Sequence, residues 1–546
     1  MNNKKQIGSY YTPKVLSTFL VDHIFLNYLP KIGPLTVLEP SCGDGEFIQS
    51  LLPHISDRDV KVDLVEIDNC ELDKSTGKLR NFLPDEQING LAQDFLQFEF
   101  RKTYSLIIGN PPYISKEYLT DDQIEICKEI CQPNISGEVK NIWPAFLIRA
   151  IENLNWDGVM CFVLPSELLQ VKYTSGLRNL ILDSFDRVEI FAFNELIFEN
   201  AEQDVVAIIG IKSHDIEDEQ GVSFYQVDKL SDLTIPNYTE MNFNVHRERL
   251  DKWTNYILSD EQLNTIDTVS ADLSLLPIKH YCQKAEVGIV TAANSFFIRK
   301  LSELRRYNLD AAYIKPILQK SNIIHNTITI TNESFQQLRS QDKSVNLVCL
   351  SNVPKEQLPK GAQEFVEEGE SDNLHKRYKM TKRTHWYHVP SIWSSHAIFC
   401  KRSHWYPRIF LNDANVLVTD SFYRVVCKKE YCAQNLVFSF YNSLTLILAE
   451  LEGRFYGGGV LELIPTEFKS LLIPYNPLIN QEQYDELEHL FSIGATLDEI
   501  LNFTDPILLP GVQNEVIQEL REMRIALFNR RTKFQGLEIG ATVEAV

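Results

Sequence analysis

Hydrophobic and polar residues follow two alternating patterns along the first 210 residues. Apolar runs of four to seven residues, typical of buried strands, are separated by stretches with apolar residues every three or four positions, as in helices. Residues 15–29, before the first run, have this helical spacing. The predicted strands are 36–39, 62–67, 90–93, 106–109, 158–164, 188–193 and 205–209. The alternation predicts an α/β fold with a doubly wound, mostly parallel, seven-stranded sheet.

The pattern changes after about residue 235. A chain of 546 residues is longer than a single core usually holds, so more than one domain is expected. We predict a first domain over residues 1–235 and a linker, rich in Asn and containing Pro236, over residues 236–275. Residues 276–475 mix short β-like runs with loops and predict a mixed α+β domain. Residues 476–546 have mostly helical spacing and predict a C-terminal helical segment.

Composition places the chain among ordinary globular proteins, with 44% hydrophobic and 23% charged residues. It has no run of 18 apolar residues, and its first residues lack the apolar core of a secretory signal. The ten cysteines include two close pairs, Cys127 with Cys131 and Cys427 with Cys432, and neither has the spacing of a zinc site. We therefore expect a cytoplasmic protein with no membrane segment and no metal ion.

The net charge of −21 argues against nucleic acid, but the charge is unevenly distributed. Residues 376–429 contain eleven Lys and Arg, two acids and three of the six tryptophans. This stretch is either a solvated basic face over core aromatics or a surface that binds phosphate groups. The cations that we take as candidates for DNA binding are Lys376, Arg377, Lys379, Lys382, Arg383, Lys401, Arg402 and Arg408.

Four polar segments follow predicted strands, where doubly wound sheets bind ligands. The first, Glu39-Pro40-Ser41-Cys42-Gly43-Asp44-Gly45, is a glycine-rich turn without the GxGxxG spacing of a dinucleotide site. Glu66-Ile67 ends the next strand, where a carboxylate can accept hydrogen bonds from ribose hydroxyls. Asp94-Phe95 could bind an adenine through its amino group and its ring face. Taken one at a time, each of these segments is also compatible with an ordinary turn or a surface acid.

The fourth segment, Asn110-Pro111-Pro112-Tyr113, has the most specific chemistry. It offers an amide oxygen, a backbone carbonyl outside the sheet and an aromatic face, and its prolines restrict the backbone. Two acceptors beside an aromatic ring can hold a planar amine and free the lone pair of its nitrogen. The segment therefore predicts methylation of an exocyclic amino group.

In this order and spacing the four segments resemble class I S-adenosylmethionine-dependent DNA methyltransferases, in particular the adenine-N6 enzymes with a TaqI-like layout and the methylase part of type IIG restriction enzymes. Residues 8–13, 198–205 and 456–465 resemble further segments of this family. The resemblance implies a methyltransferase domain followed by a DNA-recognition domain, with S-adenosylmethionine as the cofactor. Tyr113 and Phe198 would stack on the target base. The implied cofactor-binding residues are Tyr11, Thr12, Glu39, Pro40, Ser41, Cys42, Gly43, Glu66, Ile67, Asp94, Phe95 and Asn110.

The expected function is site-specific methylation of a flipped-out adenine at N6 in double-stranded DNA, as the modification component of a restriction–modification or phage-defence system. The remaining alternatives are methylation of cytosine N4, guanine N2 in ribosomal RNA or a protein glutamine, and an inactive DNA-binding relative. Residues 286–294 resemble the start of the recognition region; Thr291 and Asn294 are candidates for DNA contact, with a plain turn as the alternative. We expect a monomer, and any cognate endonuclease on a separate chain.

Overall fold

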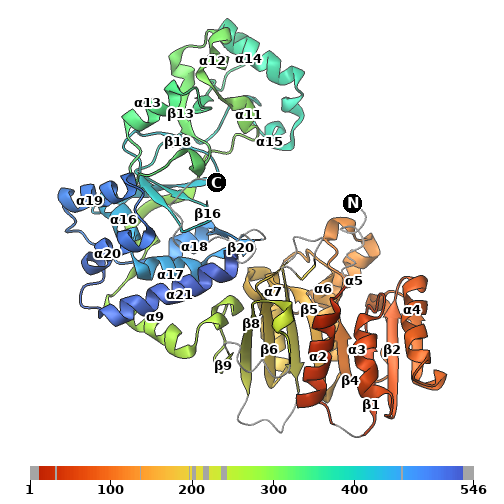
Figure 1. Cartoon of the computed structure of the whole chain (residues 1–546). Coiled ribbons are helices and arrows are strands. Elements are labelled where there is room, and N and C mark those ends of the chain that lie inside the picture. Colours follow the sequence, from red (N-terminus) through yellow and green to blue (C-terminus); the bar gives the residue numbers. More distant parts are fainter. Residues whose placement is uncertain are drawn as a thin grey trace. The chain divides into compact units, whose positions relative to one another are not determined.

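The computed structural model of the chain describes residues 11–30, 33–135, 137–195, 197–198, 204–212, 220–234, 243–456 and 459–532. Contacts within the chain divide it into two compact units, Met1–Leu263 and Asn264–Val546, which Figure 1 draws from red to blue. The two units are described in turn.

The described part of the first unit contains one sheet of nine strands, in the order β3-β2-β1-β4-β5-β7-β6-β8-β9. Strands β1 to β5 run parallel to one another, as do β6 and β8, whereas β7 is antiparallel to β5 and β6, and β9 is antiparallel to β8. The sequence therefore undercounts the sheet by two strands, β8 and β9. The strands are β1 (Leu35–Glu39), β2 (Val60–Glu66), β3 (Ile88–Ala92), β4 (Tyr104–Gly109), β5 (Leu154–Pro165), β6 (Arg187–Phe193), β7 (Val205–Ile211), β8 (Gly221–Val227) and β9 (Phe243–His246).

The strand order reverses between β1 and β4. The chain moves from β1 to β2 and β3 on one side, and from β4 to β5 on the other. Since parallel crossovers are right-handed, the connecting helices of the two halves lie on opposite faces, and a crevice opens between the carboxyl ends of β1 and β4. The main helices of this unit are α2 (Lys14–Asn27), α3 (Glu46–Ile55), α4 (Asn69–Arg80), α5 (Asp121–Cys131), α6 (Trp143–Glu152) and α8 (Ser175–Ser184).

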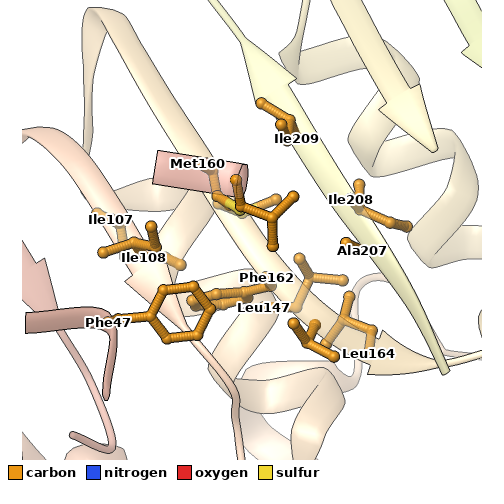
Figure 2. Packing of buried hydrophobic residues seen from close by; sticks show 14 of the residues in the cluster. Phe47, Ile107, Ile108, Leu147, Met160, Phe162, Leu164, Ala207, Ile208 and Ile209 are labelled. Atoms are coloured by element: carbon orange, nitrogen blue, oxygen red, sulfur yellow. The ribbon is translucent and has the colours of Figure 1, made fainter. Parts of the chain in front are cut away.

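The central strands are buried on both faces, which explains their continuous apolar sequences. Figure 2 shows Ile107 and Ile108 of β4, Met160 and Phe162 of β5, and Ile208 of β7 packed in one cluster. Phe47 of α3 and Leu147 of α6 contribute to the same cluster from their helices. This packing fixes β1 and β4, and with them the loops that follow.

A buried ionic network joins α2 to β6 and β8. The Glu189 carboxylate on β6 is fully buried, with His23 Nε2 at 2.6 Å and Arg187 Nη2 at 3.0 Å. The hydroxyls of Tyr28 and Tyr225 donate to Glu189 Oε1 at 2.5 and 3.3 Å. Burial raises the pKa of Glu189, but the hydrogen bond from His23 and the charges of His23 and Arg187 outweigh it and lower the pKa below its ordinary value.

The predicted linker, residues 236–275, is wrong in its described part. Strand β9 pairs with β8, so residues 243–246 belong to the sheet. Trp253 and Tyr256 have no exposed surface and lie in the hydrophobic core of the first unit. The boundary between the units falls at Leu263, inside α9 (Asp260–Asp272). The sequence missed this because two buried aromatics in a polar stretch give no periodic pattern.

The second unit is a mixed α+β structure. Its larger sheets are an antiparallel one, β11-β19-β15-β17, and a mixed one, β12-β14-β13-β18. Their strands are β11 (Cys282–Val287), β12 (Ile298–Arg299), β13 (Ile314–Leu318), β14 (Asn346–Val348), β15 (Ala397–Cys400), β17 (Ile409–Leu411), β18 (Leu417–Val418) and β19 (Phe422–Cys427). Two small sheets, β10-β22 and β16-β21-β20, are built from β10 (Leu276–Pro277), β22 (Leu472–Ile473), β16 (Arg402–Ser403), β21 (Val460–Glu462) and β20 (Arg454–Tyr456).

The helices predicted over residues 476–532 form, but they are not a separate segment. Leu487, Ile500 and Leu501 lie in the same core cluster as Phe399 and Tyr423 of the antiparallel sheet. A boundary at residue 475 is therefore absent from the described structure. The helices of this unit include α11 (Asn294–Phe297), α13 (Asn332–Ser340), α14 (Lys360–Ser371), α15 (Tyr378–Thr381), α16 (Ala433–Phe440), α17 (Ser443–Glu452), α18 (Pro465–Ser470), α19 (Gln481–Ser492), α20 (Leu497–Leu508) and α21 (Asn514–Thr532).

All ten cysteines are free thiols. Cys70 in the first unit and Cys432 in the second are exposed, Cys349 is half-buried, and the other seven are buried. Among the described residues, no group of three or more His, Cys, Asp or Glu could hold a metal ion. No helix of the described chain is both long and apolar enough to cross a bilayer.

Candidate active site

A cleft of about 450 Å³ opens at the carboxyl ends of β1, β2, β3 and β4. This volume is within the range of about 300–1,000 Å³ typical of small-molecule sites. All twelve residues predicted to bind the cofactor line it, from Tyr11 and Thr12 to Asn110. Segments that are far apart in the sequence are thus brought to one cavity at the point where the strand order reverses.

The glycine-rich turn after β1 forms one wall of the cleft. Gly43 and Gly45 have φ angles of +48° and +77°, which favour glycine. A Cβ at Gly45 would lie 2.6 Å from Ser75 Oγ on α4, so the turn also depends on a close approach between elements. Lys78 Nζ donates to the Asp44 carbonyl oxygen at 2.7 Å and Ser75 Oγ to that of Gly43 at 2.8 Å. The turn is therefore held in place by α4.

Glu66, at the end of β2, is fixed by backbone amides. Its Oε2 accepts from the Gly43 amide at 2.9 Å, and its Oε1 accepts from the amides of Ile67 and Asp68 at 2.9 and 3.1 Å. A carboxylate has about four acceptor positions, so it can accept further hydrogen bonds from a ligand. Asp68 in turn caps α4.

Asp94 and Phe95 are held by the helices that follow the Asn-Pro-Pro-Tyr segment. Asp94 Oδ1 accepts from the Leu96 amide at 2.9 Å, and Oδ2 accepts from Gln123 Nε2 of α5 at 2.9 Å. Arg149 of α6 donates to the Leu96 carbonyl oxygen at 2.5 Å, and its guanidinium carbon lies 5.5 Å from the centre of the Phe95 ring. These contacts hold the turn in place.

Asn110 and Pro112 line the cleft, whereas Pro111 and Tyr113 lie behind them. Ser41 Oγ donates to the Asn110 backbone carbonyl oxygen at 3.2 Å and links the glycine turn to this segment. The Tyr113 hydroxyl lies 2.6 Å from Asn110 Oδ1 and 2.9 Å from the Val163 carbonyl oxygen. A single hydroxyl proton can serve only one of these two acceptors at a time.

Glu39 is the most unusual acidic side chain in the cleft. It is 2% exposed, and its Oε2 has no hydrogen-bond partner among the described residues. Burial raises the pKa of Glu39 well above its usual range, and the nearby carboxylates of Asp44 and Glu66 raise it further. An orphaned, buried carboxyl oxygen of this kind is suited to a cationic group.

Sequence reasoning missed several residues of the cleft. Asp44, Asp68 and Gln93 adjoin the predicted segments, so local sequence points to them. Gln123 carries only a helix-start signal, because it closes a capping box with Thr120. Glu46 and Ile114 also adjoin predicted segments, and the lining residues without any such signal are Phe47, Glu71, Ile142 and Phe146.

The eight candidate DNA-binding cations divide into two groups. Lys376, Arg377, Lys379 and Lys382 are exposed, on or beside α15. The other four are held by contacts within the fold, although Arg402 is also exposed, and Arg377 of the first group donates to the Ala292 carbonyl oxygen. Arg383 donates to the carbonyl oxygens of Val290, Thr291 and Trp386, Arg408 donates to those of Ile324 and Thr327, and Lys401 and Arg402 pair with the buried Glu462.

Thr291 and Asn294, the other candidates for DNA contact, form a turn. Thr291 is 1% exposed; its hydroxyl donates to Asn294 Oδ1 at 2.5 Å and accepts from the Ala293 amide at 3.1 Å. For Thr291 the plain-turn alternative is therefore the right one. Phe198 is buried in the core of the first unit. Residues 8–10, 199–203 and 457–458 of the resembling segments lie outside the described residues.

A sheet that begins with the order 3-2-1-4-5-7-6, and a cleft at its switch point, define the class of protein: a methyltransferase with the class I fold. Residues 35–198 match the family model described as Eco57I restriction-modification methylase. Residues 250–509 match the model for the C-terminal domain of the type II methyltransferase M.Eco57I. The chain is therefore built from Eco57I-type restriction–modification methylase domains, as the resemblance implied.

Individual proteins support this assignment. The type II methyltransferase M.AccI of Acinetobacter calcoaceticus is 25% identical over 540 residues, which cover 93% of this chain and 94% of that protein. The modification methylase CviBIII of Paramecium bursaria Chlorella virus NC1A is 28% identical over 182 residues, 33% of this chain and 43% of that protein. The type IIL restriction–modification enzyme MmeI, solved in complex with DNA, shares the fold over 98% of this chain and 80% of its own, with a TM-score of 0.57 at 14% identity.

Proposed function

We propose that this protein transfers a methyl group from S-adenosylmethionine to the N6 amino group of an adenine flipped out of double-stranded DNA. The observation that carries the proposal is the cleft: the twelve residues assigned to the cofactor line it, and Asn110, the candidate acceptor for the amine, is one of them. A methyl donor in this cleft would lie beside Asn110, whose carboxamide oxygen can accept a hydrogen bond from an amine. The relationship to type II methyltransferases supports DNA as the substrate.

The cleft fits S-adenosylmethionine, which supplies an electrophilic methyl group on a sulfonium when bound. Glu66 would accept hydrogen bonds from the ribose hydroxyls. Asp94 would accept one from the amino group of the cofactor adenine, whose ring would lie beside that of Phe95. The orphaned Glu39 Oε2 fits the α-ammonium group of the methionine end, close to the Gly43 turn. The ribose hydroxyls, the adenine amino group and the α-ammonium group of the cofactor thus each have a matching group in the chain.

This assignment predicts that cofactor binding depends on pH through Glu39. Because its pKa is raised, Glu39 stays protonated to a higher pH than an ordinary carboxyl group, and below that pKa the binding of an ammonium group must release the proton. The affinity for S-adenosylhomocysteine should rise by about tenfold per pH unit below the raised pKa and level off above it. Calorimetric titrations between about pH 5 and 9 span the ordinary and raised carboxyl range.

Two controls make the assignment specific. 5′-Methylthioadenosine lacks the ammonium group and should bind with little pH dependence, and Glu39→Gln should flatten the dependence for S-adenosylhomocysteine. The same slope for both ligands on the wild-type protein would exclude Glu39 as the ammonium partner.

Methyl transfer needs no strong base at this site. The N6 nitrogen of adenine is a weak nucleophile because its lone pair is delocalised into the ring. If Asn110 Oδ1 and the Pro111 carbonyl oxygen each accept one N6 hydrogen, the lone pair is freed to take the methyl group from the sulfonium, and the nitrogen then releases one of its two protons to water. The chain contributes fixed acceptors and orientation, which lower the barrier through preorganisation.

Tyr113 would serve the reaction through both its ring and its hydroxyl. We propose that the ring stacks on the flipped base, with Phe198 on the other side; both rings are 6% exposed in the present structure and would have to come forward. When the base amine binds Asn110 Oδ1, the Tyr113 hydroxyl can donate to the Val163 carbonyl oxygen instead. This exchange of acceptors leaves the amide oxygen to the substrate.

Tyr113→Phe keeps the ring and removes the hydroxyl. We expect kcat to fall by up to about tenfold, the value of one ordinary hydrogen bond, with little change in KM for DNA. Steady-state methylation assays provide both constants, and Tyr118→Phe, an exposed tyrosine in the same loop, is the matched control. A rise in KM with unchanged kcat would mean that the hydroxyl acts in DNA binding instead.

The second unit would read the DNA sequence. Its exposed cations can hold phosphates, while other polar side chains contact base edges. We propose that one copy of the chain modifies its site and that a cognate endonuclease, where present, is a separate protein.

Transfer of tritiated methyl from S-adenosylmethionine to bacterial genomic DNA lacking adenine methylation tests the function. After digestion to nucleosides, label in N6-methyladenine is the expected result. Label in N4-methylcytosine would retain the mechanism and overturn the base. If the cofactor binds but no label enters DNA, the substrate is an RNA or a protein.

A further inference from the structure

Tyr378 has an aromatic side chain that lies outside the hydrophobic core. It is 76% exposed, and no other described aromatic residue is more exposed. It is the first residue of α15, in the segment 373–383 between two buried side chains, Leu374 and Met380. Most aromatics of the second unit, by contrast, lie in hydrophobic clusters. The exposure of this one ring needs a reason.

The segment 373–383 holds the ring on a fixed support. Met380 has no exposed surface and lies in the cluster that contains Phe296 and Phe365. Arg377 Nη1 donates to the Ala292 carbonyl oxygen at 3.3 Å. Arg383 donates to the Val290 and Thr291 carbonyl oxygens at 3.1 and 2.8 Å. The ring therefore projects from anchored backbone, so little ordering would be required when it binds a partner.

The surroundings of the ring are strongly cationic. Lys376, Arg377, Lys379 and Lys382 are exposed, and Lys382 Nζ lies 5.1 Å from the centre of the Tyr378 ring. The sequence contains no acid between residues 373 and 412. Two neighbouring acids on α14 are already paired: Glu368 with Arg299 and Arg306, and Glu370 with Lys355. Asp372 directly precedes the segment, so the four exposed cations are in excess there.

An exposed ring surrounded by cations suits a polyanion that also offers sugars and bases. An apolar protein surface would have to desolvate the four cations without compensation. We propose that the segment 373–383 is a DNA-binding face of the second unit, in which the four exposed cations hold phosphates and Tyr378 makes a non-ionic contact with a sugar or base. This rests on the proposed function, because it takes DNA as the substrate.

Salt dependence separates the two kinds of contact. A cation that holds a phosphate releases counterions, so its removal reduces the slope of log affinity against log salt by about one. An aromatic contact releases none, so its removal lowers the affinity equally at every salt concentration. Stacking on a base typically contributes enough for about a tenfold or larger loss on truncation.

The experiment measures binding of the full-length protein to a fluorescein-labelled duplex pool of random sequence over a range of salt concentrations. We expect Tyr378→Ala to bind about tenfold more weakly with an unchanged slope, and Lys376→Ala and Lys382→Ala each to reduce the slope by about one. Matched controls are Phe82→Ala, an exposed aromatic of the first unit, and Lys343→Ala, an exposed lysine of the second. Both should bind as the wild type does.

Each other outcome has a definite meaning. If the lysine variants lose slope while Tyr378→Ala binds like the wild type, the aromatic contact is refuted. If all three variants match the wild type, the segment is not a DNA-binding face. If the wild-type protein binds no duplex, the proposed DNA substrate falls together with this face. Hydrogen exchange of the Met380 peptide checks that each variant keeps its fold.

Discussion

Replacing Asn110 with alanine is expected to lower the rate of methyl transfer by about 10²–10³-fold, the usual effect of removing one preorganised group from a reacting centre. The variant loses the side-chain acceptor for the amine and keeps the backbone carbonyl of Pro111. Because Asn110 lines only part of the cleft, we expect the affinity for S-adenosylhomocysteine to stay within a fewfold of the wild type. Single-turnover transfer of tritiated methyl separates the chemical step from product release.

Asn81→Ala is the matched control, since Asn81 is an exposed asparagine at the end of α4 outside the cleft. It should methylate DNA at the wild-type rate. An Asn110→Ala variant that retains more than about a tenth of the wild-type rate would place the essential acceptor on another group. A variant that no longer binds the cofactor would show a structural role of Asn110 in the cleft.

The second large effect concerns stability. Glu189→Ala removes the buried carboxylate that pairs with Arg187 and accepts hydrogen bonds from His23 and Tyr28. Loss of one partner from a buried charge pair typically lowers the free energy of unfolding by about 3–5 kcal/mol. Denaturant-dependent hydrogen exchange of peptides from β6 and β8 measures the free energy of unfolding of the first unit separately. Tyr28→Phe, which removes one hydrogen bond, should lower the free energy of unfolding by about 1 kcal/mol. Glu99→Ala, at an exposed position, should have little effect on it.

The same network makes stability depend on pH. The folded-state pKa of Glu189 is lowered, so its contribution is fully present above the unfolded pKa of about 4.3. It is lost as the pH falls through the lower, folded value. Wild-type protection of β6 should therefore fall more steeply than that of Glu189→Gln on acidification below about pH 4.3. Parallel curves for the two proteins would assign the acid sensitivity to other carboxylates.

The sequence predicts the part of the fold in which local pattern and burial agree. Strands such as β4 and β5 are buried on both faces along most of their length and contain continuous apolar runs, so their positions follow from the local sequence. Strand β9 and the buried Trp253 follow a polar stretch, and their place depends on contacts with β8 and the core. Such long-range contacts leave no periodic signal.

The candidate site shows the same division. Glu39, Glu66, Asp94 and Asn110 each follow a strand, and parallel strands bring their carboxyl ends to one edge, so their meeting in one cleft was predictable. Gln123 reaches Asp94 from a helix whose position is set by packing. For the cations, the sequence shows which residues are charged but not which contacts each of them makes. Arg383 and Arg408 donate to backbone carbonyls, whereas Lys376 and Lys379 face solvent.

The distribution of exposed thiols makes the chain suitable for fluorescence labelling without prior removal of cysteines. Cys70 is at the start of α4, next to the cleft-lining Asp68 and Glu71, and Cys432 is in the other unit. Maleimide dyes should react first at these two positions, because burial protects most of the others. A donor at one and an acceptor at the other would give an energy-transfer signal that reports any change in the distance between the units when cofactor or duplex is added.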